Sequence, residues 1–143
     1  MNINYRCRAS ILSLGFLLQL ISSVAIGQLP STSDLSGQWR IRDGNPPASA
    51  AWRDTLDDSQ WQHLKVPANW YSEGVDHQGV LWYRTQFTLP VLDTDNMATL
   101  VFDGVDYQTD VWLNNQQAGQ HKGYFQRFSI DITDTARIEN VLA

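Results

Sequence analysis

The sequence predicts an all-β domain of the β-sandwich or jelly-roll class, and three observations carry that prediction. Several short runs alternate apolar and polar side chains, as strands with one buried face do. Turn-forming residues separate these runs. No long stretch repeats apolar residues at helical spacing. The 143-residue chain is therefore expected to hold one domain of packed strands.

The chain begins with the three parts of a signal peptide. Arg6 and Arg8 form a basic start, an apolar stretch follows, and Ala25 and Gly27 are the small residues that precede a cleavage site. Serine and glutamine side chains interrupt the apolar stretch, whereas a membrane anchor needs ~20 strongly apolar residues. We expect residues 1–27 to be removed as the protein is exported to the periplasm or the extracellular space, with no membrane attachment afterwards.

Cleavage of the leader changes the cysteine content and the net charge of the mature chain. It removes Cys7, the only cysteine, so that the remaining 116 residues hold no disulfide. The formal net charge of −5 becomes −7 without the two leader arginines. That charge argues against a nucleic acid or an anionic membrane as partner. All six tryptophans lie in the mature part, so a packed aromatic core is expected.

The first elements follow in order. Residues 28–34 read as a linker, because they are rich in Ser and Thr and contain a Pro. Residues 37–42 alternate Trp and Ile with two arginines, the mark of a half-buried strand. Adjacent prolines in 43–50 predict a loop, since proline donates no ladder hydrogen bond. Residues 54–67 predict a turn or short helix that enters a strand.

The second half holds the clearest strands, after a polar, glycine-spaced loop over 68–79. Strands are expected over residues 80–90, 98–105, 109–114, 116–120 and 125–133, with one more beginning near 137. The Asn114-Asn115 pair suits a type I′ turn, because Asn tolerates positive φ. Tryptophans in strand registers are usually core, which places Trp39, Trp61 and Trp82 inside. The last strand starts and then stops, so domain 35–143 is expected to be C-terminally incomplete.

Catalytic groups, metal ligands and cofactor motifs are not expected in this chain. A retaining glycosidase needs two carboxyls about 5–5.5 Å apart, but the aspartate clusters all lie in or beside predicted turns, where Asp is favoured locally. No serine stands in a nucleophile elbow. The three histidines are widely separated and lack metal-ligand spacing. No glycine-rich phosphate loop follows a strand.

Carbohydrate binding is better supported by the sequence than catalysis is. The loop over 68–79 offers an aromatic ring for a sugar face and polar groups for its hydroxyls. The substrate-binding candidates are Tyr71, Glu73, Asp76 and His77 in this loop, and His121 at the exit of the hairpin. The alternative is that these polar residues face solvent and only stabilise the turns of the loop by local hydrogen bonds.

Four ordered motifs carry a family resemblance: "VPANW", "GVLWYRTQFTLP", the run from "LVFDGV" to "DIT", and "ENVLA". They resemble the N-terminal sugar-binding domain of the family 2 glycoside hydrolases, the β-galactosidases, β-glucuronidases and β-mannosidases. The resemblance implies a galactose-binding-like jelly roll, followed in the same full-length chain by an immunoglobulin-like domain and a TIM barrel. It implies that the barrel carries the catalytic glutamates, and that this domain packs on it and lends a loop to the active-site rim.

One motif departs from the family pattern. The family's H-x-G-G-Y-x-P-F run reads "HKGYFQRF" here, with Tyr124 at the second Gly and Arg127 at the Pro. If that Gly needs a left-handed backbone, Tyr124 is strained or the loop is reshaped. The competing function is a stand-alone periplasmic carbohydrate-binding or sensory module. The histidine, glycine and D-I-T pattern favours the glycosidase.

Overall fold

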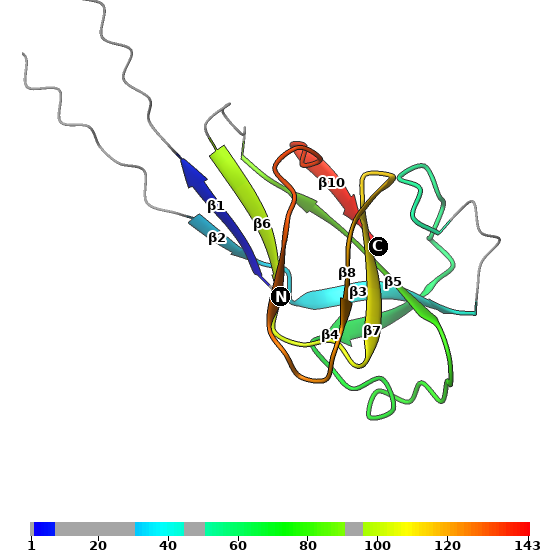
Figure 1. Ribbon diagram of the computed structural model, residues 1–143. Coiled ribbons are helices and arrows are strands. Elements are labelled where there is room, and N and C mark those ends of the chain that lie inside the picture. Colours follow the sequence, from blue (N-terminus) through cyan, green and yellow to red (C-terminus); the bar gives the residue numbers. More distant parts are fainter. Residues whose placement is uncertain (1, 8–30, 45–50, 91–95) are drawn as a thin grey trace, which may run out of the picture.

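The computed structural model describes residues 2–7, 31–44, 51–90 and 96–143, which form strands joined by turns and loops (Figure 1). Its strands are β1 (Asn2–Cys7), β2 (Ser31–Asp34), β3 (Gly37–Asp43), β4 (Gln62–Val66), β5 (Leu81–Thr88), β6 (Asn96–Phe102), β7 (Gln108–Leu113), β8 (Gln116–Lys122), β9 (Phe128–Asp131) and β10 (Glu139–Leu142). The predicted all-β class is confirmed. In these ranges no helix is long and apolar enough to cross a membrane.

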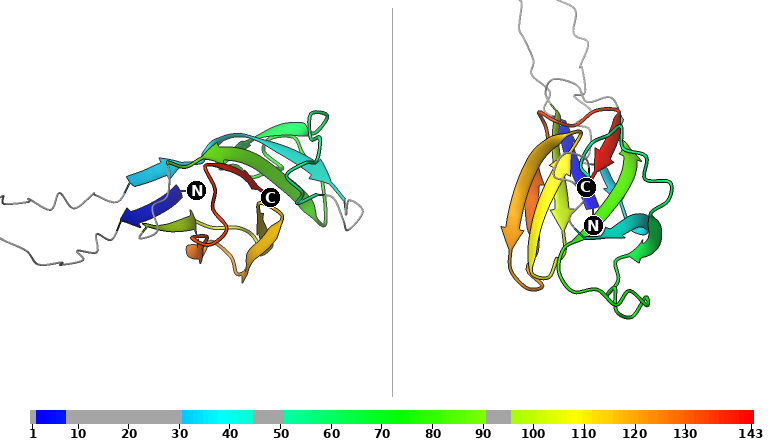
Figure 2. Two further views of the ribbon diagram at one scale, coloured as in Figure 1. Left: turned by 90° about the horizontal axis from the view of Figure 1, so that it is seen from above. Right: turned by 90° about the vertical axis from the view of Figure 1, so that its right-hand side faces the viewer.

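The strands form two sheets that face each other as a sandwich (Figure 2). One sheet has the order β4-β3-β5-β10-β7-β8, and the other has the order β2-β1-β6-β9. The recorded strand pairs are antiparallel. The larger sheet curls, so that β8 at its edge comes into contact with β9 of the smaller sheet. This curl closes one side of the sandwich.

The core lies between the two layers and follows the predicted alternation. In β3, Trp39 and Ile41 are 6% and 2% exposed, while the arginines between and after them reach toward solvent. Burying such a side chain contributes roughly 1.5–3 kcal/mol. Trp39 belongs to a core cluster with Phe87, Leu89, Ala98, Leu100, Phe102, Val111, Leu113, Ile130, Ile132 and Leu142. These residues come from both sheets, so the layers are held by apolar packing.

Backbone conformation settles two predictions about turns. Asn114 and Asn115 have φ values of 51° and 75°, which confirms the positive-φ turn between β7 and β8. In the "HKGYFQRF" run the left-handed residue is Phe125, with φ 48°, and not Tyr124. The loop has been reshaped rather than strained at the position of the second Gly. Consequently β9 starts at Phe128, three residues later than predicted.

Three other segments bear on the sequence predictions. Part of the predicted linker 28–34 is the strand β2, and part of the predicted leader 1–27 is β1, which pairs with both β2 and β6. Of the turn or short helix predicted over residues 54–67, the turn is the alternative that forms, and it enters β4. There the Asp57 carboxylate accepts the backbone N–H of Ser59 and caps a turn. Most of the predicted loop 43–50 and of the turn between β5 and β6 lies outside the described residues.

Candidate functional site

A cavity of about 720 Å³ opens at one end of the sandwich, between the two layers. We call it the end cavity. Its inner wall is apolar, formed by core side chains that include Trp39, Tyr83, Phe102 and Val111. Its size is that of pockets for small molecules. The end cavity is therefore a concave surface on which a ligand site can be considered.

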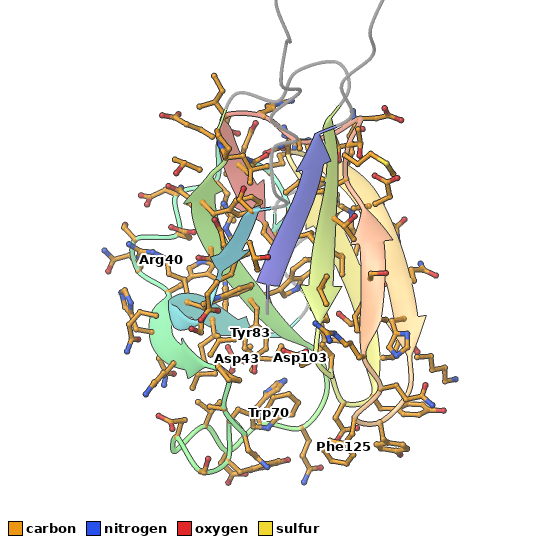
Figure 3. The ribbon with its side chains drawn as sticks, turned by 90° about the vertical axis from the view of Figure 1, so that its left-hand side faces the viewer. Arg40, Asp43, Trp70, Tyr83, Asp103 and Phe125 are labelled. Carbon is orange, nitrogen blue, oxygen red and sulfur yellow. The ribbon has the colours of Figure 1, made fainter. Side chains whose placement is uncertain are left out.

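The mouth of the end cavity is formed by loops from different parts of the chain (Figure 3). Trp70 and Tyr71 come from the loop after β4, and their rings lie 5.9 Å apart. Phe125 comes from the β8–β9 loop and is 86% exposed. Its left-handed backbone packs against Gly104, where an added Cβ would lie 3.1 Å from the Phe125 Cα. Two aromatic edges thus flank the opening.

Carboxylates add negative charge to this mouth. Asp103, Asp106 and Asp110 line the cavity and are solvent exposed. Asp103 forms an exposed ion pair with Arg127, with 3.4 Å between Oδ1 and Nε. Asp103 and Asp106 lie in the β6–β7 loop and Asp110 lies in β7. Their exposed carboxylates can accept hydrogen bonds from sugar hydroxyls.

Two tryptophan N–H groups lack partners. The indole Nε1 atoms of Trp70 and Trp82 are buried, and no hydrogen bond acceptor reaches them among the described residues. A buried N–H without a partner costs about 1–3 kcal/mol. Both residues line the end cavity. Deeper inside, burial raises the pKa of the Tyr83 phenol from 10.0 to about 12, so this side chain stays neutral at physiological pH.

Of the five substrate-binding candidates, the structure brings only Tyr71 to the end cavity. Its hydroxyl donates to the carbonyl of His77, 2.9 Å away, and His77 Nε2 lies 2.8 Å from the Val80 carbonyl. These bonds fold the loop back on itself. Glu73 and Asp76 are exposed on the same loop, outside the cavity lining.

The fifth candidate, His121, lies apart from this loop. Its ring stacks on Phe128, with centroids 4.0 Å apart and an angle of 11° between the planes. Its Nε2 is buried and has no partner among the described residues. His121 does not line the end cavity. The histidine is therefore placed by packing between β8 and β9.

Sequence reasoning missed the residues that shape the mouth. Trp70 and Phe125 lie in loops, where an aromatic residue has no periodic pattern to mark it. Asp103 and Asp106 belong to an aspartate cluster for which the sequence predicts turn positions, with a catalytic carboxyl pair as the less favoured alternative. The sequence does contain one signal. Large aromatic residues stand in segments whose composition is that of exposed loops, as in "ANW" and "GYF". Nothing local in the sequence indicates that the two loops meet.

A second aromatic group lies on the outer face of the six-stranded sheet. Trp52, Trp82 and Trp112 form this tryptophan cluster, with ring centroids 5.4–6.2 Å apart. The prediction that Trp82 lies in the core is therefore wrong, because Trp82 is half-buried on the face opposite to Tyr83. The predictions for Trp39 and Trp61 are confirmed, at 6% and 7% exposed.

The described residues show no group of three or more His, Cys, Asp or Glu side chains arranged to hold a metal ion. Comparison with known families matches residues 52–143 to the glycosyl hydrolase 2 galactose-binding domain-like family. The match covers well over half of the chain, and the chain belongs to this family. The galactose-binding-like β-sandwich predicted from the sequence is thereby confirmed.

Individual relatives are glycosidases. A β-galactosidase of Bacteroides ovatus is 29% identical over 78% of this chain and 15% of its own length. A β-mannosidase of Rattus norvegicus is 29% identical over 92% of this chain and 16% of its own length. Among solved structures, the β-glucuronidase of Bifidobacterium dentium in complex with coumarin-3-O-glucuronide is 29% identical, with a TM-score of 0.65, over 76% of this chain and 18% of that protein.

A Bacteroides uniformis β-glucuronidase has the same fold, with a TM-score of 0.67 at 25% identity over 77% of this chain and 14% of that protein. The chain thus spans about a seventh to a fifth of the length of these four proteins. It corresponds to a single domain of multidomain enzymes.

Proposed function

We propose that this chain is the non-catalytic, N-terminal carbohydrate-binding and scaffolding domain of an exported β-glycosidase that hydrolyses O-glycosyl bonds. The observation that carries the proposal is the family match over residues 52–143. The geometry supports it, because the mouth of the end cavity combines aromatic edges with exposed carboxylates. That arrangement suits contact with a sugar and lacks a buried acid for its hydrolysis.

The catalytic groups belong, in this proposal, to other domains of the same full-length chain. The partners are an immunoglobulin-like domain and a TIM barrel whose glutamates act as acid/base and nucleophile. The loop over 68–79 projects beyond the end of the sandwich (Figure 3) and is the element that we assign to the rim of the barrel's active site. Glu73 and Asp76 are exposed on it and are free to meet a substrate there.

Export carries a consequence for the fold. Cleavage after Gly27 removes Asn2–Cys7, the strand β1 that lies between β2 and β6. The mature domain then has an unpaired edge on β6 unless another strand replaces β1, and such an edge invites association. Mass spectrometry of the exported protein tests this step. A mature N-terminus at Gln28 supports it, and an N-terminus at Met1 contradicts it.

The stand-alone carbohydrate-binding or sensory module is the second candidate. The exposed Phe125 and Tyr71 favour it, because aromatic rings at an opening can stack on a free sugar without help from another domain. The gene beyond the codon for Ala143 separates the two functions. A reading frame that encodes a barrel supports the glycosidase. A stop codon, a membrane-spanning segment or an esterase domain at that point contradicts it.

The rim assignment has its own test in the complete protein. Asp76→Ala removes an exposed carboxylate for which no hydrogen bond or ion pair is recorded, so stability should not change. We expect kcat/KM on an aryl β-glycoside to fall at least threefold. The matched control is Asp134→Ala, another exposed aspartate, which lies in the β9–β10 connection. Equal kinetics for both variants would remove the 68–79 loop from the active site.

A further inference from the structure

A second concave surface, of about 440 Å³, lies away from the end cavity, and no described residue lines both. We call it the Trp52 groove. Its described lining consists of Trp52, Arg53, Asp54, Thr55 and Asn115. Asn115 follows the end of β7, whereas Thr109 and Asp110 near the start of β7 line the end cavity. The groove and the mouth of the end cavity therefore lie toward opposite ends of this strand (Figure 1).

The Trp52 ring is held in place by the tryptophan cluster. It stacks on Trp112 with ring centroids 5.6 Å apart and an angle of 20° between the planes, and it contacts Trp82 at 6.2 Å. The preceding residue, Ala51, is 0% exposed, and its carbonyl accepts a hydrogen bond from Arg84 Nη1 at 2.7 Å. An indole that is fixed in this way loses little conformational freedom when a ligand binds to it.

Contacts between distant parts of the sequence fix the polar wall of the groove. Asn115 Oδ1 accepts the backbone N–H of Asp54 at 2.8 Å, which joins the 51–56 segment to the turn between β7 and β8. The Asp54 carboxylate in turn pairs with Arg137 Nη1 at 3.5 Å, and Arg137 lies in the connection between β9 and β10. Three segments that are far apart in the chain therefore build and support this one surface.

Three side chains of the groove have polar groups that are free to bind a ligand. Among the described residues, no hydrogen bond or ion pair is recorded for the Arg53 guanidinium, the Thr55 hydroxyl or the Asn115 Nδ2. All three residues are exposed. Guanidinium and amide groups donate hydrogen bonds, and a hydroxyl both donates and accepts. The described lining has one positive and one negative side chain, so it favours a ligand without net charge.

We propose that the Trp52 groove is a second carbohydrate-binding site, which takes one unit of a neutral oligosaccharide. The C–H face of a pyranose lies against the Trp52 ring, and its hydroxyls accept hydrogen bonds from Arg53 and Asn115. An aromatic surface with a few polar groups around it is the usual composition of a small-molecule site. Because most of the described lining residues are exposed, the neighbouring sugar units can extend into water on either side.

The site goes beyond the proposed function, because it lies away from the 68–79 loop that we assign to the active-site rim. In the complete enzyme, a second contact of this kind raises the effective concentration of a sugar chain near the catalytic domain. It does so without taking part in hydrolysis. The argument for the site depends only on the groove, whether or not the complete protein is a glycosidase.

A docking surface for another protein fits the groove less well. The buried centre of a protein interface is apolar and depleted of charged residues. Here Trp52 is the one apolar side chain among the described lining residues, and the other four are polar or charged. The exposed polar groups instead match the hydroxyls of a sugar.

The test uses the complete protein and two oligosaccharides, β-linked mannotetraose and β-linked galactotetraose, in which sulfur replaces the glycosidic oxygen to prevent hydrolysis. Hydrogen exchange measured by mass spectrometry locates the bound sugar on the chain. We expect at least one of the two sugars to slow backbone exchange at least twofold in peptides that cover residues 51–56 and 113–117. The sugar concentration that gives half of this protection measures the dissociation constant.

Matched variants assign the protection to the groove. Trp52→Ala should raise the dissociation constant at least tenfold, because it removes the ring surface. Arg53→Ala should raise it at least threefold. No contact is recorded for the Arg53 guanidinium, so this variant decides the test if Trp52→Ala fails to fold. The controls are Trp70→Ala and Arg127→Ala, at the mouth of the end cavity and beside it, which should leave protection of the groove unchanged.

Three outcomes would overturn the proposal. The first is that neither sugar protects residues 51–56 and 113–117. The second is an equal dissociation constant for Arg53→Ala and Arg127→Ala. The third is protection confined to the 68–79 loop, which would place the carbohydrate at the mouth alone. A complete protein that hydrolyses aryl β-glycosides but shows no protection of the groove would refute the second site and leave the proposed function standing.

Discussion

Asn114 Nδ2 donates a hydrogen bond to Asn140 Oδ1 over 2.9 Å, joining the turn after β7 to β10. The same amide group donates to the Thr135 carbonyl at 2.7 Å and accepts the backbone N–H of Val141 at 3.0 Å. Asn114 is 3% exposed, so each of these bonds is shielded from water. The two neighbouring asparagines therefore differ: Asn114 fixes the sheet and Asn115 lies on the surface.

Asn114→Gly should destabilise the domain by about 2–3 kcal/mol, because it leaves buried donors and acceptors unpaired. The matched change Asn115→Gly should shift stability by no more than about 0.5 kcal/mol. Both positions have positive φ, so glycine relieves backbone strain in each. Asn115 Oδ1 also accepts the backbone N–H of Asp54 at 2.8 Å, in an exposed position, so the difference compares the buried bonds of Asn114 with one solvent-exposed bond. Urea unfolding of both variants measures it, and equal losses would contradict this role for Asn114.

Arg84→Met should destabilise the domain by about 3 kcal/mol. The Arg84 guanidinium is 1% exposed and bonds to Asp58 at 2.9 Å and to the Ala51 carbonyl at 2.7 Å, so its loss leaves buried partners uncompensated. Arg40→Met is the control, because Arg40 also pairs with Asp58, at 3.2 Å, but is a third exposed. We expect a loss of no more than about 1 kcal/mol there. Thermal unfolding that ranks the variants in the reverse order would be the contrary result.

Gly119→Ala should destabilise the domain by about 1–3 kcal/mol through overpacking. A Cβ at Gly119 would lie 2.9 Å from Ile130 Cδ1, between β8 and β9. Ile130→Val removes that atom, so the double variant should be more stable than the sum of the two single losses predicts. Gly123→Ala is the control, since the nearest atom to its added Cβ belongs to the flexible Gln126 side chain, at 2.8 Å, with His121 Nε2 at 3.2 Å. Strict additivity in the double-mutant cycle would refute the contact.

Alkaline titration should reveal Tyr83. Burial raises its pKa to about 12, while the unfolded chain ionises near pH 10. The neutral Tyr83 phenol therefore contributes fully to the stability of the folded state below pH 10. This contribution is lost as the pH rises toward 12. Ultraviolet absorbance should show a phenol that ionises near pH 12, and Tyr83→Phe should abolish this late phase. A late phase that persists in the variant would assign it to another tyrosine.

Period-2 patterns predicted the strands that have one buried face, such as β3 with Trp39 and Ile41. They failed for β2, whose four residues are all polar, and for β1, which lies in a segment with the composition of a leader. Local patterns also carry no information on pairing partners. The place of β10 between β5 and β7 depends on contacts across more than 25 residues, which no short window of sequence contains.

The candidate site was predicted less well than the fold. The sequence directed attention to polar residues of the 68–79 loop, and Tyr71 does reach the end cavity. Phe125 was missed because its exposure depends on a left-handed backbone in a reshaped loop. Trp82 was placed in the core because a strand register alone does not say which face is inside. The outer face is covered by the segment around Trp52, which no periodic pattern marks.

Hydrolysis by the complete protein tests the central claim most directly. The complete protein and the chain over 28–143 are each assayed on aryl β-glucuronide, β-galactoside and β-mannoside. We predict that the complete protein releases the aryl group from at least one of the three, and that residues 28–143 alone release none. Failure of the complete protein on all three substrates, or hydrolysis by residues 28–143 alone, would contradict the account.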